Sequence, residues 1–161
     1  RIASTFTTTY LKTFGLGIES ANFIFALMMC FGAVGSIEGG TLIEKLGEKL
    51  TVTAEMIVLG SLSLASIYTS NLYFLCFIIV IVGFFLLGVW PSFYSIIAKA
   101  TSLGARAFMY GLLFAIAWSF GSFWPYLSGV FADNFGIQII YTLIGVLSLL
   151  GALTAHFTFK K

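Results

Sequence analysis

The chain has 161 residues, of which 60% are hydrophobic and only 9% are charged, and its formal net charge is +2. A water-soluble domain of this length needs a charged shell over its core, so this composition excludes an ordinary soluble fold and indicates a polytopic membrane protein surrounded by the lipid bilayer. The net charge is too small to suggest nucleic acid as a partner. Because the first residue is Arg1 rather than Met, we expect the chain to be part of a longer protein.

Residues 2–11, IASTFTTTYL, form the first segment, which is too short to cross a bilayer because a spanning helix takes about 20 residues. We interpret this segment as the last half of a truncated helix. Its polar residues indicate either a wet face or an ordinary interfacial helix end. They are Thr5, Thr7, Thr8 and Thr9.

Five longer apolar stretches follow, separated by clusters of charge and turn residues. No charge occurs between residues 56 and 98, which is about twice the length that one crossing can use, so the chain must turn inside this stretch, at Ser70 and Asn71. Their length distinguishes these stretches from ordinary buried helices, and with the short first segment they predict an all-α fold. The five predicted spanning helices are 21–43, 51–69, 72–98, 107–132 and 137–159.

Lysine and arginine gather at alternate connections between the predicted spans. Positive residues accumulate in short cytoplasmic loops, whereas the connections around Ser70 and Asp133 hold none. We therefore predict that the C-terminus and the loops at 44–50 and 99–106 are cytoplasmic, in a protein of the plasma membrane. The bases at these positions are Lys45, Lys49, Lys99, Arg106, Lys160 and Lys161.

Two polar turns of the chain share one pattern, which is glycine, three residues, an acid, two residues and glycine. Residues 40–47 read GTLIEKLG and residues 129–136 read GVFADNFG. The predicted topology places these turns on opposite faces of the membrane, each between the second and third helix of a three-helix unit. Three-helix units repeated with inverted topology are typical of secondary transporters. The outer repeat turn is then defined by Gly129, Asp133 and Gly136.

Residues 39–50, GGTLIEKLGEKL, resemble the cytoplasmic loop motif of the major facilitator superfamily, G-x-L-x-D-R-x-G-R-[RK]. Glu44 and Lys45 keep the charges of the family's Asp and Arg, whereas Glu48 reverses the charge of a base. Arg106, Pro125 and the GVFADNFG turn are similar to the eleventh helix and the loop after it. The positions that match the loop motif directly are Gly40, Leu42, Gly47 and Lys49.

This resemblance implies that residues 1–161 are the C-terminal half of a twelve-helix transporter. It implies secondary active transport of a small solute by alternating access, with the N-terminal half of the same transporter as partner, with no cofactor and with a proton as one candidate coupling ion. The implied helix numbers are 7 for residues 1–11, 8 for 21–43, 9 for 51–69, 10 for 72–98, 11 for 107–132 and 12 for 137–159.

The resemblance also implies a latch, in which Glu44 meets the start of helix 11 near Arg106 while the cytoplasmic gate is closed. Physically, Gly40 and Gly47 allow a tight reversal and close approach of backbones. An acid beside the positive end of a helix is favourable by roughly 0.3–1 kcal/mol, so the contact can break. The alternative is a solvated loop whose charges serve only orientation.

Candidate substrate-binding residues are polar or aromatic groups near the membrane midplane. Arg1 lies about ten residues before the loop at Lys12 and would suit an anionic substrate through bidentate hydrogen bonds. The others are Trp90, which precedes Pro91, and three neighbours in the fourth long span. Packing between helices is the alternative role for tryptophan and serine. Those three neighbours are Trp118, Ser119 and Ser122.

Two further acids, Glu38 and Glu55, lie within two helical turns of the predicted cytoplasmic surface. A carboxyl desolvated there can carry a proton. The interpretation we favour is pairing with Lys45 or Lys49.

The sequence contains no histidine cluster, HExxH motif, nucleophile elbow or metal-spaced acid pair. We therefore expect no enzyme and no metal site. A non-transporting membrane subunit or receptor-like scaffold with the same fold is the alternative function, and a six-helix intramembrane enzyme would need midplane acids or histidines that this chain lacks. The sequence leaves open the substrate, the direction of transport and the coupling ion.

Overall fold

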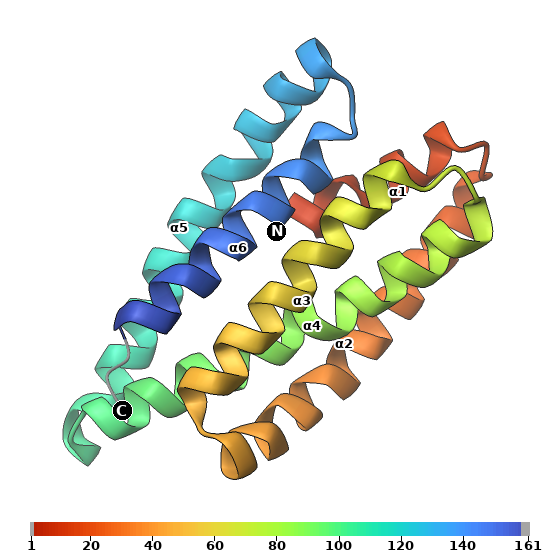
Figure 1. Ribbon diagram of the computed structural model, residues 1–161. Coiled ribbons are helices and arrows are strands. Elements are labelled where there is room, and N and C mark those ends of the chain that lie inside the picture. The colour runs from red at the N-terminus through yellow and green to blue at the C-terminus, as the bar shows by residue number, and fades with distance from the viewer. Residues whose placement is uncertain (1, 159–161) are drawn as a thin grey trace.

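The computed structural model describes residues 2–158, and these residues form a bundle of six α-helices without a strand (Figure 1). Five of the helices are long and apolar enough to cross a membrane, and α1 is shorter. The all-α polytopic architecture predicted from the sequence is therefore confirmed. The helices are α1 (Ile2–Thr13), α2 (Ile18–Leu46), α3 (Glu48–Tyr68), α4 (Leu72–Ala100), α5 (Leu103–Phe135) and α6 (Ile139–Thr158).

The helices run past most of the predicted spans because the turns between them are very short. α5 has 33 residues and includes positions on either side of 107–132. The predicted turn at Ser70 and Asn71 is confirmed, since α3 ends at Tyr68 and α4 begins at Leu72. The Asn71 side chain caps α4, because its Oδ1 accepts hydrogen bonds from the backbone N–H groups of Tyr73 at 3.0 Å and Phe74 at 3.2 Å. Residue 159, the predicted end of the last span, lies outside the described residues.

The connections alternate between the two ends of the bundle. The α2–α3 and α4–α5 turns lie at one end, and the α1–α2, α3–α4 and α5–α6 turns lie at the other (Figure 1). Lys45, Lys49, Lys99 and Arg106 therefore share one end, which we call the basic end. Lys160 and Lys161 lie outside the described residues.

The two repeated turns have the same backbone geometry. Gly47 has φ 79° and ψ 162°, and Gly136 has φ 84° and ψ 157°. Each glycine N–H donates a 2.9 Å hydrogen bond to the carbonyl four residues earlier. These positive φ values favour glycine, which explains why both motifs end on it. Glu44 and Asp133 occupy the same position in their turns, three residues before that glycine.

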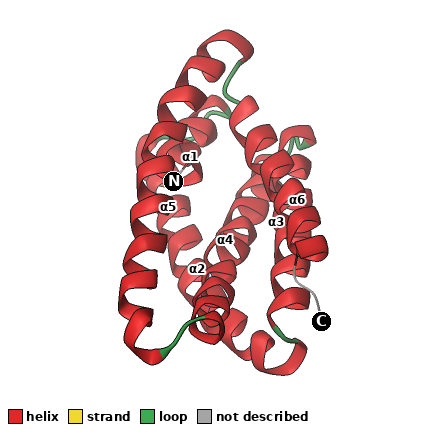
Figure 2. Ribbon diagram, turned by 90° about the vertical axis from the view of Figure 1, so that its left-hand side faces the viewer, coloured by secondary structure: helices red, strands yellow, loops and turns green. Residues whose placement is uncertain are grey.

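The packing of the helices follows the inverted repeat. If each helix of the first unit (α1, α2, α3) corresponds to one of the second (α4, α5, α6), every contact between helices should have an equivalent. The contacts α2·α4, α3·α4, α1·α2 and α2·α3 correspond to α1·α5, α1·α6, α4·α5 and α5·α6, and the contact α3·α6 corresponds to itself. All nine of these pairs pack together in the described part of the chain. Figure 2 shows α1 and α5 on one side of the bundle and α3 with α6 on the other. Two three-helix units therefore share one packing scheme.

The most extensive contact between helices is the crossing of α2 and α4, where glycines bring the two backbones together. A Cβ on Gly35 would lie 2.0 Å from the Phe84 carbonyl oxygen, and one on Gly39 would lie 2.2 Å from that of Gly88. We call this crossing the glycine seam. We expected Gly40 to allow close approach of neighbouring backbones, but it has open space around it. The glycine that meets another backbone is Gly39, one residue earlier.

A buried cluster of one threonine and two tyrosine side chains attaches α1 to α3 and α6. The Tyr10 hydroxyl donates to the Ser66 carbonyl oxygen at 3.1 Å, and Thr7 Oγ1 and the Tyr141 hydroxyl are 2.9 Å apart. The rings of Tyr10 and Tyr141 lie 4.6 Å apart. Thr7 is fully buried, so the wet-face interpretation is wrong for this threonine. Its hydroxyl holds the helix in place instead.

We expect Gly35→Ala to destabilise the bundle by about 1–3 kcal/mol or more, because the added methyl group meets a backbone carbonyl that cannot rotate away. Gly40→Ala is the matched control in the same helix, since its Cβ meets nothing within 4 Å. Thermal unfolding of the detergent-purified full-length protein measures both. Equal melting temperatures for the two variants would show that the seam does not determine stability.

Candidate functional site

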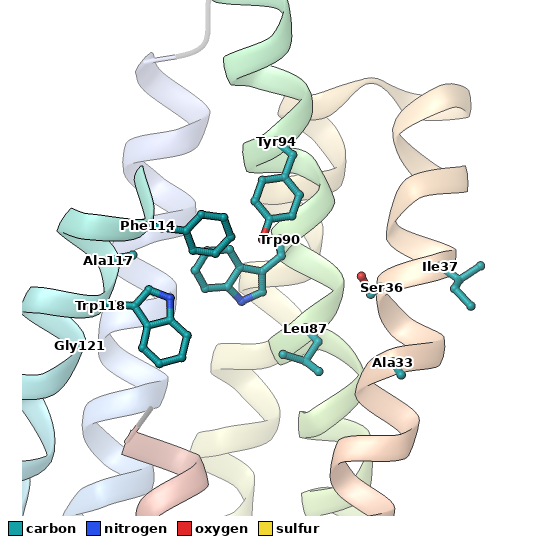
Figure 3. A pocket seen from close by; sticks show the side chains of 10 residues that line it. All are labelled: Ala33, Ser36, Ile37, Leu87, Trp90, Tyr94, Phe114, Ala117, Trp118 and Gly121. Carbon is teal, nitrogen blue, oxygen red and sulfur yellow. The ribbon is translucent and has the colours of Figure 1, made fainter. Parts of the chain in front are cut away.

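A pocket of about 690 Å³ opens between α2, α4 and α5 (Figure 3). α2 contributes small and aliphatic side chains, whereas α4 and α5 contribute four aromatic rings. No charged residue is among those that line it, so the pocket is apolar apart from the hydroxyl groups of Ser36 and Tyr94 and the two indole N–H groups. Its lining residues are Ala33, Ser36, Ile37, Leu87, Trp90, Tyr94, Phe114, Ala117, Trp118 and Gly121.

Aromatic rings from two helices form the wall of this pocket. The rings of Trp90 and Phe114 are nearly parallel, with centroids 6.3 Å apart and an interplanar angle of 10°. Tyr94 lies one helical turn from Trp90, and its ring centroid is 5.9 Å from that of Phe114. The Tyr110 hydroxyl donates to the Tyr94 carbonyl oxygen at 3.1 Å and ties α5 to α4. Such a surface binds apolar or aromatic groups by stacking and cations over the ring faces.

The position of α5 leaves this aromatic surface uncovered. Of the residues of α5, Ser128 alone is buried within the described part of the chain, and the Trp118 side chain is 52% exposed. Ala117 and Gly121 lie on the pocket side of the same helix, where their small size leaves room between the rings. In a chain that spans a membrane, an exposed apolar face of this extent contacts lipid, a ligand or another protein surface.

The structure brings together two of the five predicted substrate-binding residues, Trp90 and Trp118. Ser119 and Ser122 do not line this pocket, and Ser122 Oγ donates to the Trp118 carbonyl oxygen at 2.8 Å within α5. Arg1 lies outside the described residues. Sequence reasoning missed Tyr94 and Phe114, although each is one helical turn from a tryptophan already selected, and that spacing was the available signal.

At the basic end, the acid that forms an ion pair is Glu48, whereas Glu44 was expected to meet the start of helix 11 near Arg106. Glu48 Oε1 pairs with Lys99 Nζ and accepts a 2.7 Å hydrogen bond from Ser95 Oγ. Glu44 is exposed, with no hydrogen bond or ion pair to any described residue. The expected contact between Glu44 and Arg106 is thus absent from this structure. The reason is geometric, because the one-residue turn at Gly47 places Glu48 at the start of α3, which packs on α4.

The remaining residues of the loop motif are distributed around this turn. Lys45 is exposed and Lys49 is half-buried, and neither forms an ion pair with a described acid. Arg106 is half-buried, and its Nε has no hydrogen-bond partner among the described residues. In the outer repeat turn, Asp133 is exposed and Gly129 meets only the Phe6 ring, at 3.8 Å from its Cβ position.

The two acids near the basic end do not pair with lysine, so the favoured interpretation was wrong. Glu38 is exposed and accepts a 3.2 Å hydrogen bond from Thr41 Oγ1. Glu55 is buried between helices, and neither of its carboxylate oxygens has a partner among the described residues. Lys45 and Lys49 lie at the turn, whereas Glu55 faces the glycine seam from α3.

Comparison of the sequence with known proteins identifies the family to which the chain belongs. The family model of the Major Facilitator Superfamily matches residues 2–161, so the chain belongs to this family. It is 30% identical over 156 residues to the fosmidomycin resistance protein of Escherichia coli (strain K12). The alignment covers 95% of this chain and 37% of that relative. No solved structure matches the chain.

Membership of this family agrees with the membrane-spanning helices, and the family is one of transporters rather than enzymes. Within residues 2–158 we find no group of three or more His, Cys, Asp or Glu residues that could hold a metal ion. The expectation that the protein is not an enzyme stays a prediction.

We expect Glu48→Gln to lower the free energy of unfolding by up to about 1 kcal/mol, because it weakens a pair in which Lys99 is 71% exposed and screened by solvent. Glu44→Gln removes the same charge one turn earlier and should change stability by much less. Denaturant unfolding of both variants checks this. A larger loss of stability in Glu44→Gln than in Glu48→Gln would show that Glu44, not Glu48, stabilises this end of the bundle.

Proposed function

We propose that this chain is the C-terminal half of a secondary active transporter that moves a small solute by alternating access. The family match supports transport in general. The pocket between α2, α4 and α5 is the observation on which the proposal depends, because it places four aromatic rings on a face that the described helices leave uncovered. In this proposal the N-terminal half covers that face, and residues 1–161 hold helices 7 to 12.

The chemistry of the pocket indicates the substrate class. Its rings and aliphatic side chains suit a solute with an apolar, aromatic or cationic body, and Ser36 offers a hydroxyl for orientation. Fosmidomycin is the first compound to test, since a relative is named a fosmidomycin resistance protein. Recognition of anionic groups would then fall to residues outside this pocket, such as Arg1 or the facing half.

Trp90→Ala and Trp118→Ala should each weaken transport in cells or vesicles that contain the full-length protein. Loss of about 1.4 kcal/mol of ring contact corresponds to a tenfold rise in the substrate concentration needed for half-maximal transport. Ser119→Ala is the control on the same helix, because Ser119 does not line the pocket. Transport of a panel of hydrophobic, cationic and fosmidomycin-like compounds measures the effect.

Unchanged transport in both tryptophan variants would remove the pocket from the substrate site. Absence of transport by the unmodified protein for the whole panel, with normal membrane insertion, would favour the alternative of a non-transporting scaffold with the same fold.

The proposed orientation places the basic end in the cytoplasm, with the protein in the plasma membrane. A cysteine at position 45 should then react with an impermeant thiol reagent only from the cytoplasmic side, and one at position 134 only from outside, because Lys45 and Asn134 lie at opposite ends of the bundle. Labelling of intact cells and of inverted vesicles distinguishes the two sides. Reaction of both positions from one side would contradict this orientation.

A further inference from the structure

Glu55 is an acid buried at the meeting point of three helices. Its side chain is 2% exposed, and neither Oε1 nor Oε2 has a hydrogen-bond partner among the described residues. Oε1 lies 3.2 Å from the Cβ position of Gly39 on α2 and 2.9 Å from that of Gly88 on α4. The carboxyl group of α3 therefore fills a notch that the glycine seam leaves open.

No charged group of the surrounding helices neutralises this carboxyl. On α2, Glu38, Glu44 and Lys45 are exposed, and on α4 Lys99 is paired with Glu48. On α6, which packs on the other side of α3, His156 is exposed. On α3 itself, Lys49 is almost two helical turns away and half-buried at the turn. An unpaired buried charge is costly, and a bound proton removes it.

Polar side chains lie along α3 and α4 between Glu55 and the basic end, without a continuous chain of hydrogen bonds among the described residues. Glu48, Thr51 and Glu55 share one face of α3 at spacings of three and four residues, and this face packs on α4. On α4, Gly88 is followed at similar spacings by Ser92, Ser95 and Lys99.

The two rows meet at both ends. Glu48 contacts Ser95 and Lys99, and Glu55 contacts Gly88. Between these contacts, Thr51 Oγ1 and Ser92 Oγ are both buried without a hydrogen-bond partner among the described residues. We call Thr51, Ser92 and Ser95 the polar file. Its hydroxyl groups can each donate and accept a hydrogen bond, which lets them pass a proton between neighbouring water molecules or polar groups.

We propose that the Glu55 carboxyl is a proton-binding site that exchanges with water at the basic end through the polar file. A proton from water binds one carboxylate oxygen, forms an O–H group and takes the side-chain charge from −1 to zero. Release reverses this step and returns the proton through the same hydroxyls.

Crowding selects a proton over a metal ion as the ligand. A cation such as Na⁺ or Mg²⁺ needs a shell of about six oxygen ligands around a volume of its own. The Glu55 carboxyl instead fills the space that Cβ atoms on Gly39 and Gly88 would occupy, and no group of three or more His, Cys, Asp or Glu among the described residues could supply such a shell. A proton needs no added space, so the notch fits it.

The site also depends on the conformation of the bundle. Gly39 and Gly88 cover the carboxyl from two helices that are not connected in sequence, so separation of α3 from the seam would admit water and favour loss of the proton. If transport proceeds by alternating access, as proposed above, proton binding would then be linked to that motion. Existence of the site itself does not depend on transport.

Infrared difference spectroscopy of the purified full-length protein during a pH change tests the site. We expect a carbonyl-stretch band of a protonated carboxylic acid that shifts in D₂O and is absent from Glu55→Gln, which keeps the shape of the neutral side chain. Glu38→Gln is the control, because Glu38 is an exposed acid near the same end. An unchanged band in Glu55→Gln would overturn the proposal.

The route is tested by the rate at which that band shifts after transfer to D₂O. Thr51→Val and Ser92→Ala should slow the shift severalfold, whereas Ser66→Ala should not, because Ser66 is a buried serine of α3 that donates to its own helix at the Ser63 carbonyl oxygen. Equal rates in all variants would exclude the polar file. Trp90→Ala should leave the band unchanged, because Trp90 lines the aromatic pocket and not the notch around Glu55. The infrared band therefore tests the proton site separately from the transport function proposed for the pocket.

Discussion

The close crossing of α2 and α4 is the contact on which the rest of this bundle depends. Backbone meets backbone at Gly35 and Gly39, so no side chain can adjust to relieve a change there. The seam fixes which residues of α2 and α4 face the aromatic pocket, since Ser36 and Leu87 are sequence neighbours of its glycines. It also shapes the notch around Glu55. One packing contact thus positions both a ligand pocket and a buried acid.

The two three-helix units share a topology but not a packing density. The counterpart of the α2·α4 seam is the α1·α5 contact, where Gly129 meets only the Phe6 ring and Ser128 is the one residue of α5 that is buried in the described part of the chain. The pocket therefore has two walls held by the seam and a third, α5, held by fewer contacts, among them the Tyr110 hydroxyl on the Tyr94 carbonyl oxygen. A difference in pocket shape between two conformations would come more easily from α5 than from α2 or α4.

Sequence reasoning found the spanning helices, the turn at Ser70 and Asn71 and the equivalence of the two glycine turns, because each depends on length, charge or backbone conformation close by in the chain. It failed where a side chain contacts a residue from a distant part of the sequence. Thr7 is buried because the Tyr141 hydroxyl meets it from the far end of the sequence. Periodicity gives the faces of a helix but not the neighbour that each face meets, so it did not show that the Phe114 ring of α5 stacks on Trp90 of α4.

Because sequence alone does not show which helix a side chain meets, it also did not show which of the two acids at the α2–α3 turn would form an ion pair. Glu44 and Glu48 are one helical turn apart in sequence, but Gly47 ends one helix between them and reverses the chain. Glu48 consequently faces α4 and is held by Lys99 and Ser95, whereas Glu44 faces away from the described helices. The reversed charge at 48 is therefore satisfied within this chain. The acid that ties this turn to a neighbouring helix is therefore Glu48 rather than Glu44.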